Sequence, residues 1–159
     1  MDLVPALVAG LGLPLAALAA GFAWRARDGR VRTIAAELSS TSTATASRRD
    51  ADDLGLGGDR LGADATLVQF STEFCSRCPS TARALEGLAG GYDGVRHVEV
   101  DLTHDPALAD RFRVTQTPTV LVLDADGRTA GRVAGVPRTT ELRRLIDDLT
   151  RRNRVPHHA

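Results

Sequence analysis

Residues 69–80, QFSTEFCSRCPS, hold both cysteines of the chain, Cys75 and Cys78, with two residues between them. The run ATLVQFS at 65–71 is mostly apolar, which is typical of a buried strand. The run STARALEGLAG at 80–90 has apolar residues at helical spacing and ends on the first of two paired glycines, which stop a helix. A cysteine pair between a strand and a helix could be a redox centre, half of a metal site or a structural disulfide.

The position of the pair favours a redox centre. A thiol at the start of a helix lies near the positive end of the helix dipole and near unpaired backbone N–H groups, and both favour the thiolate. Cys75 is therefore the expected nucleophile. Cys78, one turn further along, is placed to attack a mixed disulfide formed on Cys75. Arg77 between them adds a positive charge that favours the thiolate and shifts the pair toward oxidant character.

The two other interpretations of the cysteines are weaker. A structural zinc site needs four ligands, and the chain has no second cysteine pair. Its four histidines, at positions 97, 104, 157 and 158, match no zinc spacing. A structural disulfide that closes so short a loop removes little entropy from the unfolded chain. We therefore expect neither a metal nor a cofactor.

Length and charge exclude several classes of protein. The chain has 159 residues, enough for one compact domain with appendages but not for two full-sized domains. Its formal net charge is +0 and its pI is near 6.9, so it lacks the basic surface that nucleic-acid binding needs. No nucleic-acid partner is expected.

The N-terminal part of the chain predicts a membrane anchor. Residues 3–24 contain no charged side chain and are long enough, as a helix, to cross a hydrocarbon core of about 30 Å. A cleaved signal peptide would need a positive start and a shorter apolar core, whereas here Asp2 leads. The positive-inside rule then places the following chain in the cytoplasm, because four arginines follow the segment, at positions 25, 27, 30 and 32. Residues 1–32 are expected to form the anchor and its basic flank, with the opposite orientation left open.

The rest of the chain divides into three parts. Residues 33–60 include the small, polar run SSTSTATASRRDADD, which lacks apolar periodicity and predicts a flexible linker. Near its end, Leu54, Leu56 and Leu61 suggest a short segment that packs on the domain. Residues 61–152 form the predicted domain, and residues 153–159 a disordered tail.

Strand and helix patterns alternate in the domain and predict an α/β fold. After the first strand and helix, the patterns indicate a strand at 95–101, a helix at 105–112, a strand at 118–124, an edge strand in RTAGRVAG and a helix at 139–152. The turn DADG at 124–127 predicts a hairpin. The order is therefore β-α-β-α-β-β-α. We expect the first three strands to be parallel, because helices connect them, and the last to be antiparallel, because a hairpin precedes it.

Several motifs together resemble thioredoxin-like proteins over residues 61–152. They are FCSRC after the strand TLVQF, the segment TQTPTVLVLD, the turn DADG, and VAGV before the last helix. The resemblance implies a shortened thioredoxin-like fold, because the first strand and helix of the full fold have no clear counterpart. It also implies that Thr117 and Pro118 form the family's cis-proline bond facing the cysteines, where Thr117 offers its backbone to a substrate peptide. Phe74, in the place of the family's tryptophan, is assigned to substrate binding with them.

Three positions depart from the family pattern and are predicted to tune the cysteine pair. Arg77 lies where the family has proline, so the family's redox potential cannot be transferred. Gln69 takes the place of a buried aspartate that serves proton transfer to the resolving cysteine, and an amide cannot act as a general base. His97 takes the place of the lysine that partners this aspartate, and an imidazole titrates near about pH 6.5. An ordinary strand residue is the alternative for His97.

These observations predict a membrane-anchored thiol–disulfide oxidoreductase that acts through Cys75 and Cys78. In a reducing cytosol it would reduce protein disulfides, with a redox donor or acceptor protein as its second partner. The same chemistry outside the membrane, in disulfide exchange or apocytochrome reduction, is one alternative. The other is a non-catalytic module that uses the fold as a docking surface.

Overall fold

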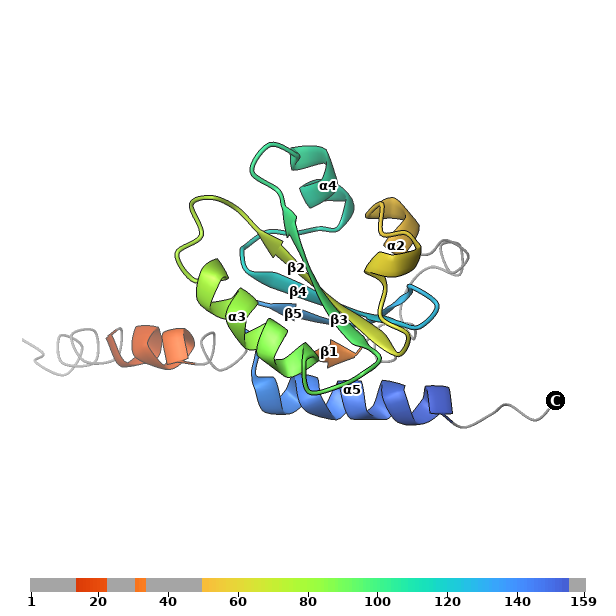
Figure 1. The fold of residues 1–159 in the computed structure, drawn as a ribbon. Helices are drawn as coiled ribbons and strands as arrows, with labels where there is room; N and C mark the ends of the chain where they lie inside the picture. The colour runs from red at the N-terminus through yellow and green to blue at the C-terminus, as the bar shows by residue number, and fades with distance from the viewer. Residues whose placement is uncertain (1–13, 23–30, 34–49, 155–159) are drawn as a thin grey trace, which may run out of the picture.

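The computed structural model describes residues 14–22, 31–33 and 50–154 of the chain. Residues 14–22 are helical, and Figure 1 labels the other α-helices and the strands but not the short 3-10 helix at residues 58–60. In chain order, the other elements are β1 (Arg32–Thr33), α2 (Asp50–Asp53), η2 (Gly58–Arg60), β2 (Ala65–Ser71), α3 (Cys78–Ala89), β3 (Val95–Asp101), α4 (Pro106–Arg111), β4 (Thr119–Asp124), β5 (Thr129–Ala134) and α5 (Thr139–Arg154). The order predicted for the domain, β-α-β-α-β-β-α, is confirmed from β2 to α5.

The strands form one mixed sheet in the order β1-β5-β4-β2-β3. β2 and β3 are parallel, whereas β4 is antiparallel to both of its neighbours, β2 and β5. The prediction that the first three strands of the domain are parallel is therefore wrong for β4. The six residues of α4 rise only about 9 Å, too little to carry the chain back along the seven-residue β3, which spans about 23 Å. The chain instead enters β4 from the end of the sheet where β3 finished.

The sheet has a hydrophobic cluster on each face. On one face, Ala65 and Leu67 of β2 pack with residues of α3 and α5. On the other face, Val68 and Phe70 pack with residues of α2 and α4. Figure 1 shows α3 and α5 below the sheet and α2 and α4 above it. Because both faces are covered, every residue of β2 is buried, which fixes the position of the cysteine loop that follows it.

Residues 50–60 of the predicted linker pack against the domain. Ala51 and Leu56 are 1% and 2% exposed, and they belong to the cluster on the α2 and α4 face. The Asp50 carboxylate accepts hydrogen bonds from the backbone N and from Oγ1 of Thr129, which ties α2 to β5. The packing expected for the leucines of this segment is confirmed. Residues 34–49 of the linker lie outside the described residues.

The helix α5 continues through Arg154, beyond the end predicted at Arg152. Asn153 Nδ2 donates to Ala63 O at 2.9 Å and to Asp64 Oδ1 at 2.8 Å, so the last turn of α5 is held to the loop before β2. The first two residues of the predicted tail therefore belong to the helix. Residues 155–159 lie outside the described part of the chain.

The predicted membrane anchor falls largely outside the described residues. Of residues 3–24, the structure describes only the helical segment 14–22, in which every residue is exposed. In the part of the chain that is described, no helix is long and apolar enough to cross a membrane. Arg32, the last arginine of the basic flank, lies in the short strand β1, which pairs with β5 at the edge of the sheet.

Candidate active site

The two cysteines lie where the loop after β2 enters α3. Cys78 is the first residue of α3 and is 3% exposed, whereas Cys75 in the preceding loop is half-buried. They form a disulfide with a Cα–Cα distance of 5.4 Å. Within the loop, Cys75 N donates to Thr72 O at 3.0 Å, and Cys78 N donates to Cys75 O at 3.1 Å. Cys75 is thus the more exposed of the two cysteines.

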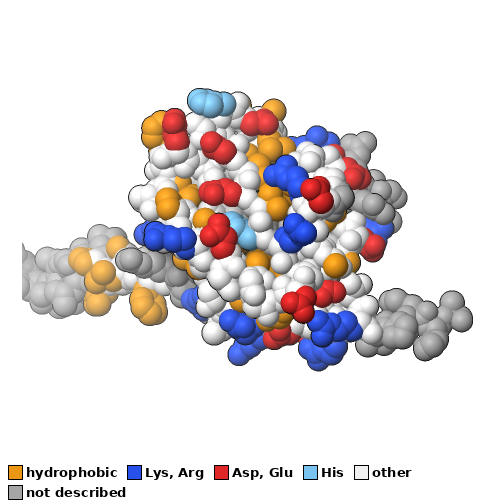
Figure 2. Space-filling model, viewed as in Figure 1, with side chains coloured by type: hydrophobic (Ala, Val, Ile, Leu, Met, Phe, Trp, Pro, Cys, Tyr) orange, Lys and Arg blue, Asp and Glu red, His pale blue; other side chains and the backbone are white. Residues whose placement is uncertain are grey.

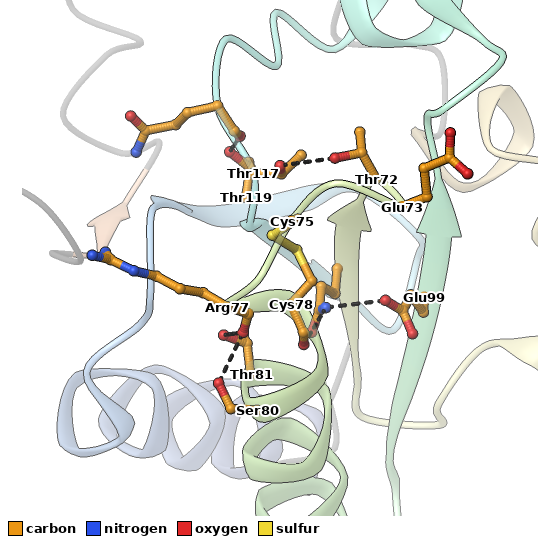
Figure 3. Close-up of a disulfide and its surroundings, with 12 residues drawn as sticks. Thr72, Glu73, Cys75, Arg77, Cys78, Ser80, Thr81, Glu99, Thr117 and Thr119 are labelled. Atoms are coloured by element: carbon orange, nitrogen blue, oxygen red, sulfur yellow. Dashed lines mark hydrogen bonds between the residues drawn. A yellow bond between two sulfur atoms is a disulfide. The ribbon is translucent and has the colours of Figure 1, made fainter.

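The loop before β4 faces the cysteine loop. Thr117 and Pro118 are joined by a cis peptide bond, in agreement with the resemblance. Thr117 Oγ1 lies 3.3 Å from Thr72 Oγ1, and Figure 3 shows these two side chains pointing toward each other. The Pro118 carbonyl accepts a hydrogen bond from Gly135 N at 2.8 Å. Gly135 has a φ of 85°, which favours glycine, so this residue fixes the chain after β5 against the same loop.

An open cavity of about 400 Å³ lies beside the disulfide. It is lined by Thr72, Phe74, Cys75, Ser76, Arg77 and Thr117. The side chain of Phe74 is 86% exposed, although most aromatic side chains are largely buried. An exposed aromatic ring beside a reachable sulfur offers an apolar contact to a docked peptide. The cavity therefore presents an exposed apolar ring next to Cys75.

Gln69 lies beneath the cysteine pair and is fully buried. Its Nε2 donates to Cys78 O at 3.1 Å and to Oε1 of Glu99 on β3 at 3.2 Å. Its Oε1 is buried without a hydrogen-bond partner among the described residues. The amide therefore holds the start of α3 to the sheet, and it supplies no basic group to take the Cys78 proton.

His97 lies on the face of β3 that packs against α3. Its side chain is 6% exposed, and its Nδ1 lies 3.9 Å from Oε1 of Glu86 on α3. Burial lowers the pKa of His97 below its ordinary value of 6.5, and the carboxylates of Glu86 and Glu99 offset part of this shift. The imidazole is therefore mainly neutral at neutral pH. It does not line the cavity at the disulfide.

Arg77 is exposed, and its side chain extends away from the disulfide in Figure 3. Its backbone carbonyl accepts hydrogen bonds from Ser80 Oγ and Thr81 Oγ1, each at 2.9 Å, which supports the first turn of α3. A charge in water is screened by salt. Any effect of the guanidinium on Cys75 therefore depends on ionic strength.

The structure brings most of the predicted site residues together. Those that line the cavity are Phe74, Cys75, Arg77 and Thr117. Three others adjoin it: Cys78 is bonded to Cys75, Pro118 follows Thr117, and Gln69 donates to Cys78 O. His97 is not brought to the cavity and instead lies against Glu86.

Three further residues of the site were not predicted, and one of them, Ser76, lines the cavity between the two cysteines in sequence. Thr72 lines the cavity and contacts Thr117, and Glu99 accepts from Gln69. The sequence held a signal for Glu99, because parallel pairing of the strands at 65–71 and 95–101 from their first residues places it beside Gln69. The sequence offered no comparable signal for Thr72.

Comparisons with known proteins agree with this geometry. The family model described as Thioredoxin matches residues 60–148. The thioredoxin of Staphylococcus saprophyticus is 32% identical over 90 residues, which are 56% of this chain and 86% of that protein. The thioredoxin of Chlamydia trachomatis is 31% identical over 88 residues, which are 55% of this chain and 85% of that protein. Among solved structures, a mutant thioredoxin from Halobacterium salinarum has a TM-score of 0.49 and 28% identity, covering 55% of this chain and 75% of that one.

A mixed α/β sheet that holds a Cys-x-x-Cys pair at a helix start defines a thiol–disulfide oxidoreductase. The chain belongs to the thioredoxin family. The substrates of that chemistry are protein thiols and disulfides.

Proposed function

We propose that the chain is a membrane-anchored oxidoreductase that reduces or exchanges disulfides of other proteins, with Cys75 as the nucleophile. One observation carries the proposal: the half-buried Cys75 lies in an open cavity beside the exposed Phe74, while its partner Cys78 is 3% exposed. Only the outer sulfur can meet a disulfide on a bulky protein. The buried sulfur of Cys78 remains next to Cys75, where it can attack a mixed disulfide formed on Cys75.

The reaction takes place in two exchange steps. The Cys75 thiolate attacks one sulfur of a substrate disulfide, which forms a Cys75–substrate mixed disulfide and releases the other substrate sulfur as a thiolate. The Cys78 thiolate then attacks the Cys75 sulfur, which forms the Cys75–Cys78 disulfide and releases the second substrate thiolate. The dithiol loses two electrons and the substrate gains them. A dithiol protein that acts as donor must reduce the pair again for the next turnover.

The residues around the pair have distinct roles in this proposal. Thr117 presents its backbone to the substrate segment, Pro118 shapes that loop, and Phe74 provides an apolar contact. Gln69 and Glu99 hold the start of α3, so they position Cys78 without transferring its proton. The proton of Cys78 then leaves through water.

The anchor is proposed from the apolar residues 3–24 and the arginines that follow them. Support comes from the described helical segment, where Leu15, Leu18 and Phe22 are 61%, 70% and 78% exposed. Side chains of this kind are suited to contact with lipid. The arginines favour a catalytic domain on the cytoplasmic side, where the pair would act as a reductase.

The second candidate is the same exchange outside the membrane, including reduction of apocytochrome disulfides. It is favoured by the replacement of the family's buried acid with the neutral Gln69 and by Arg77 between the cysteines, because both alter the environment that sets the redox potential. A docking module without catalysis is the third candidate, and the intact cysteine pair argues against it.

Insulin reduction separates an oxidoreductase from a docking module without catalysis. The full-length chain in detergent, supplied with dithiothreitol, should reduce insulin disulfides, and Cys75→Ser should abolish this activity. Absence of activity with both cysteines intact would favour the docking module. For the side of the membrane, an active periplasmic-type reporter fused to the C-terminus would refute the cytoplasmic placement.

A further inference from the structure

The outer edge of β3 has no partner strand among the described residues. β3 is the last strand of the sheet, and no described segment pairs with its outer side, whereas the opposite edge of β5 is covered by β1. In Figure 1, β3 runs along the front of the sheet. An open edge strand presents a row of unpaired backbone N–H and C=O groups that can bind another strand.

The outward-facing residues of β3 can be identified from its pairing with β2. Leu102 N, directly after β3, donates to Ser71 O at 2.9 Å. Backbone groups of successive residues in a strand point to alternate sides. The even-numbered residues of β3 therefore bond to β2, and the odd-numbered ones, which include His97 and Glu99, point their N–H and C=O groups away from the sheet.

We infer that β3 pairs antiparallel with β3 of a second copy of the chain, about a two-fold axis at Val98. In this register His97 lies opposite Glu99 of the second copy, and Val98 lies opposite its own counterpart. Every residue of the strand from Val95 to Asp101 then has a partner. The odd-numbered residues meet as hydrogen-bonded pairs, as their outward backbone groups require.

Charge selects this register over its neighbours. An axis at position 99 would place the carboxylates of two Glu99 side chains directly opposite each other, and like charges in that position are destabilising. An axis at position 97 would oppose two His97 side chains and leave fewer residues paired. Charges on an edge strand usually discourage self-pairing because like charges meet. In VRHVEVD, His97 and Glu99 instead lie one residue to either side of the centre, so the carboxylate meets an imidazole, which can donate a hydrogen bond to it.

The surface along β3 has room for a second strand. A cavity of about 460 Å³ follows this edge and is lined by Asp59, Arg60, Arg96, His97, Val98 and Glu99. Figure 2 shows acidic, basic and hydrophobic side chains interleaved over this face of the molecule. His97 Nε2 is buried without a hydrogen-bond partner among the described residues, and the pairing brings a carboxylate next to the imidazole.

Cysteine cross-linking tests the register directly. In the full-length chain in detergent, with Cys75→Ser and Cys78→Ser, the added Val98→Cys places two thiols in a non-hydrogen-bonded pair, where the Cα atoms are about 4.5 Å apart. Oxidised glutathione should then link two copies through this residue. Arg96→Cys and Val100→Cys are the matched controls. Each alone should give no dimer, but their mixture should, because these two positions face each other in the register.

Two results would overturn the inference. One is the absence of a covalent dimer with Val98→Cys, and the other is equal cross-linking at positions 96, 98 and 100, which would indicate random collision in the micelle. A change of charge at position 99 provides an independent measurement by sedimentation. Glu99→Arg should at least halve the dimer fraction, because it replaces the carboxylate opposite His97 with a cation, whereas Glu99→Gln, which keeps an oxygen acceptor, should leave most of the dimer. A dimer fraction that Glu99→Arg does not change would contradict the pairing of these two residues.

Discussion

Gln69 connects the first residue of α3 to the sheet, so its replacement should loosen the active site. Gln69→Leu keeps most of the side-chain volume and removes the amide. Two hydrogen bonds are lost, to Cys78 O and to Glu99 Oε1, each contributing about 1 kcal/mol net. The substitution also removes the buried, unpartnered Oε1, which offsets part of this loss. We expect the free energy of unfolding to fall by about 1–2 kcal/mol.

Urea unfolding of the oxidised full-length chain, followed by far-UV circular dichroism, measures this change. Glu99→Gln is the matched control, because it keeps an oxygen acceptor for Gln69 Nε2 at an exposed position, and it should change the stability by less than about 0.5 kcal/mol. A Gln69→Leu variant that is as stable as the parent, or more stable, would refute the reasoning. The unpartnered Oε1 would then outweigh both hydrogen bonds.

Three further predictions concern the packed segment before the domain, the buried imidazole and the exposed charge. Leu56→Ala should lower the free energy of unfolding by about 2–5 kcal/mol, because Leu56 is 2% exposed, and an unchanged urea midpoint would show that residues 50–60 do not belong to the domain. Because the pKa of His97 is lowered in the folded state, the contribution of His97 to stability is present above pH 6.5 and is lost as the pH falls below that value. His97→Gln should therefore flatten the decline in Tm between about pH 7 and pH 5. An unaltered decline in Tm would contradict this assignment to His97. Arg77→Ala should slow alkylation of reduced Cys75 about twofold at low salt and not at high salt, whereas a salt-independent effect would show that the guanidinium acts by contact.

Much of the fold could be predicted because local patterns agree with the packing. β2 is buried on both faces, so its sequence is a mostly apolar run without alternation, and a short apolar run of this kind predicts a buried strand. The helix predicted at 105–112 is another example, because Asp105 accepts from Leu108 N at its start and Pro106 is suited to the first helical position. The direction of β4 was missed because the expectation rested on the presence of a connecting helix and not on its length, although the predicted helix at 105–112 is too short to carry the chain back along the strand at 95–101.

The two cysteines of the candidate site were more predictable than the contacts that hold them in place. Cys75 and Cys78 are identified by spacing and by position between a strand and a helix. The contacts of Gln69 with Cys78 and Glu99 join β2, α3 and β3, so they depend on tertiary packing and strand register. The sequence indicated that Gln69 is unusual, but only the structure shows that its amide holds α3 to the sheet.

The most direct test of the account asks which sulfur attacks. The full-length Cys78→Ser and Cys75→Ser variants would each be reduced, incubated with a disulfide-bonded protein, quenched with acid and analysed by mass spectrometry. The account predicts a stable mixed disulfide on Cys75 in Cys78→Ser and almost none on Cys78 in Cys75→Ser, because Cys78 is 3% exposed. Equal yields of mixed disulfide on the two cysteines, or a higher yield on Cys78, would contradict the assignment of Cys75 as the nucleophile.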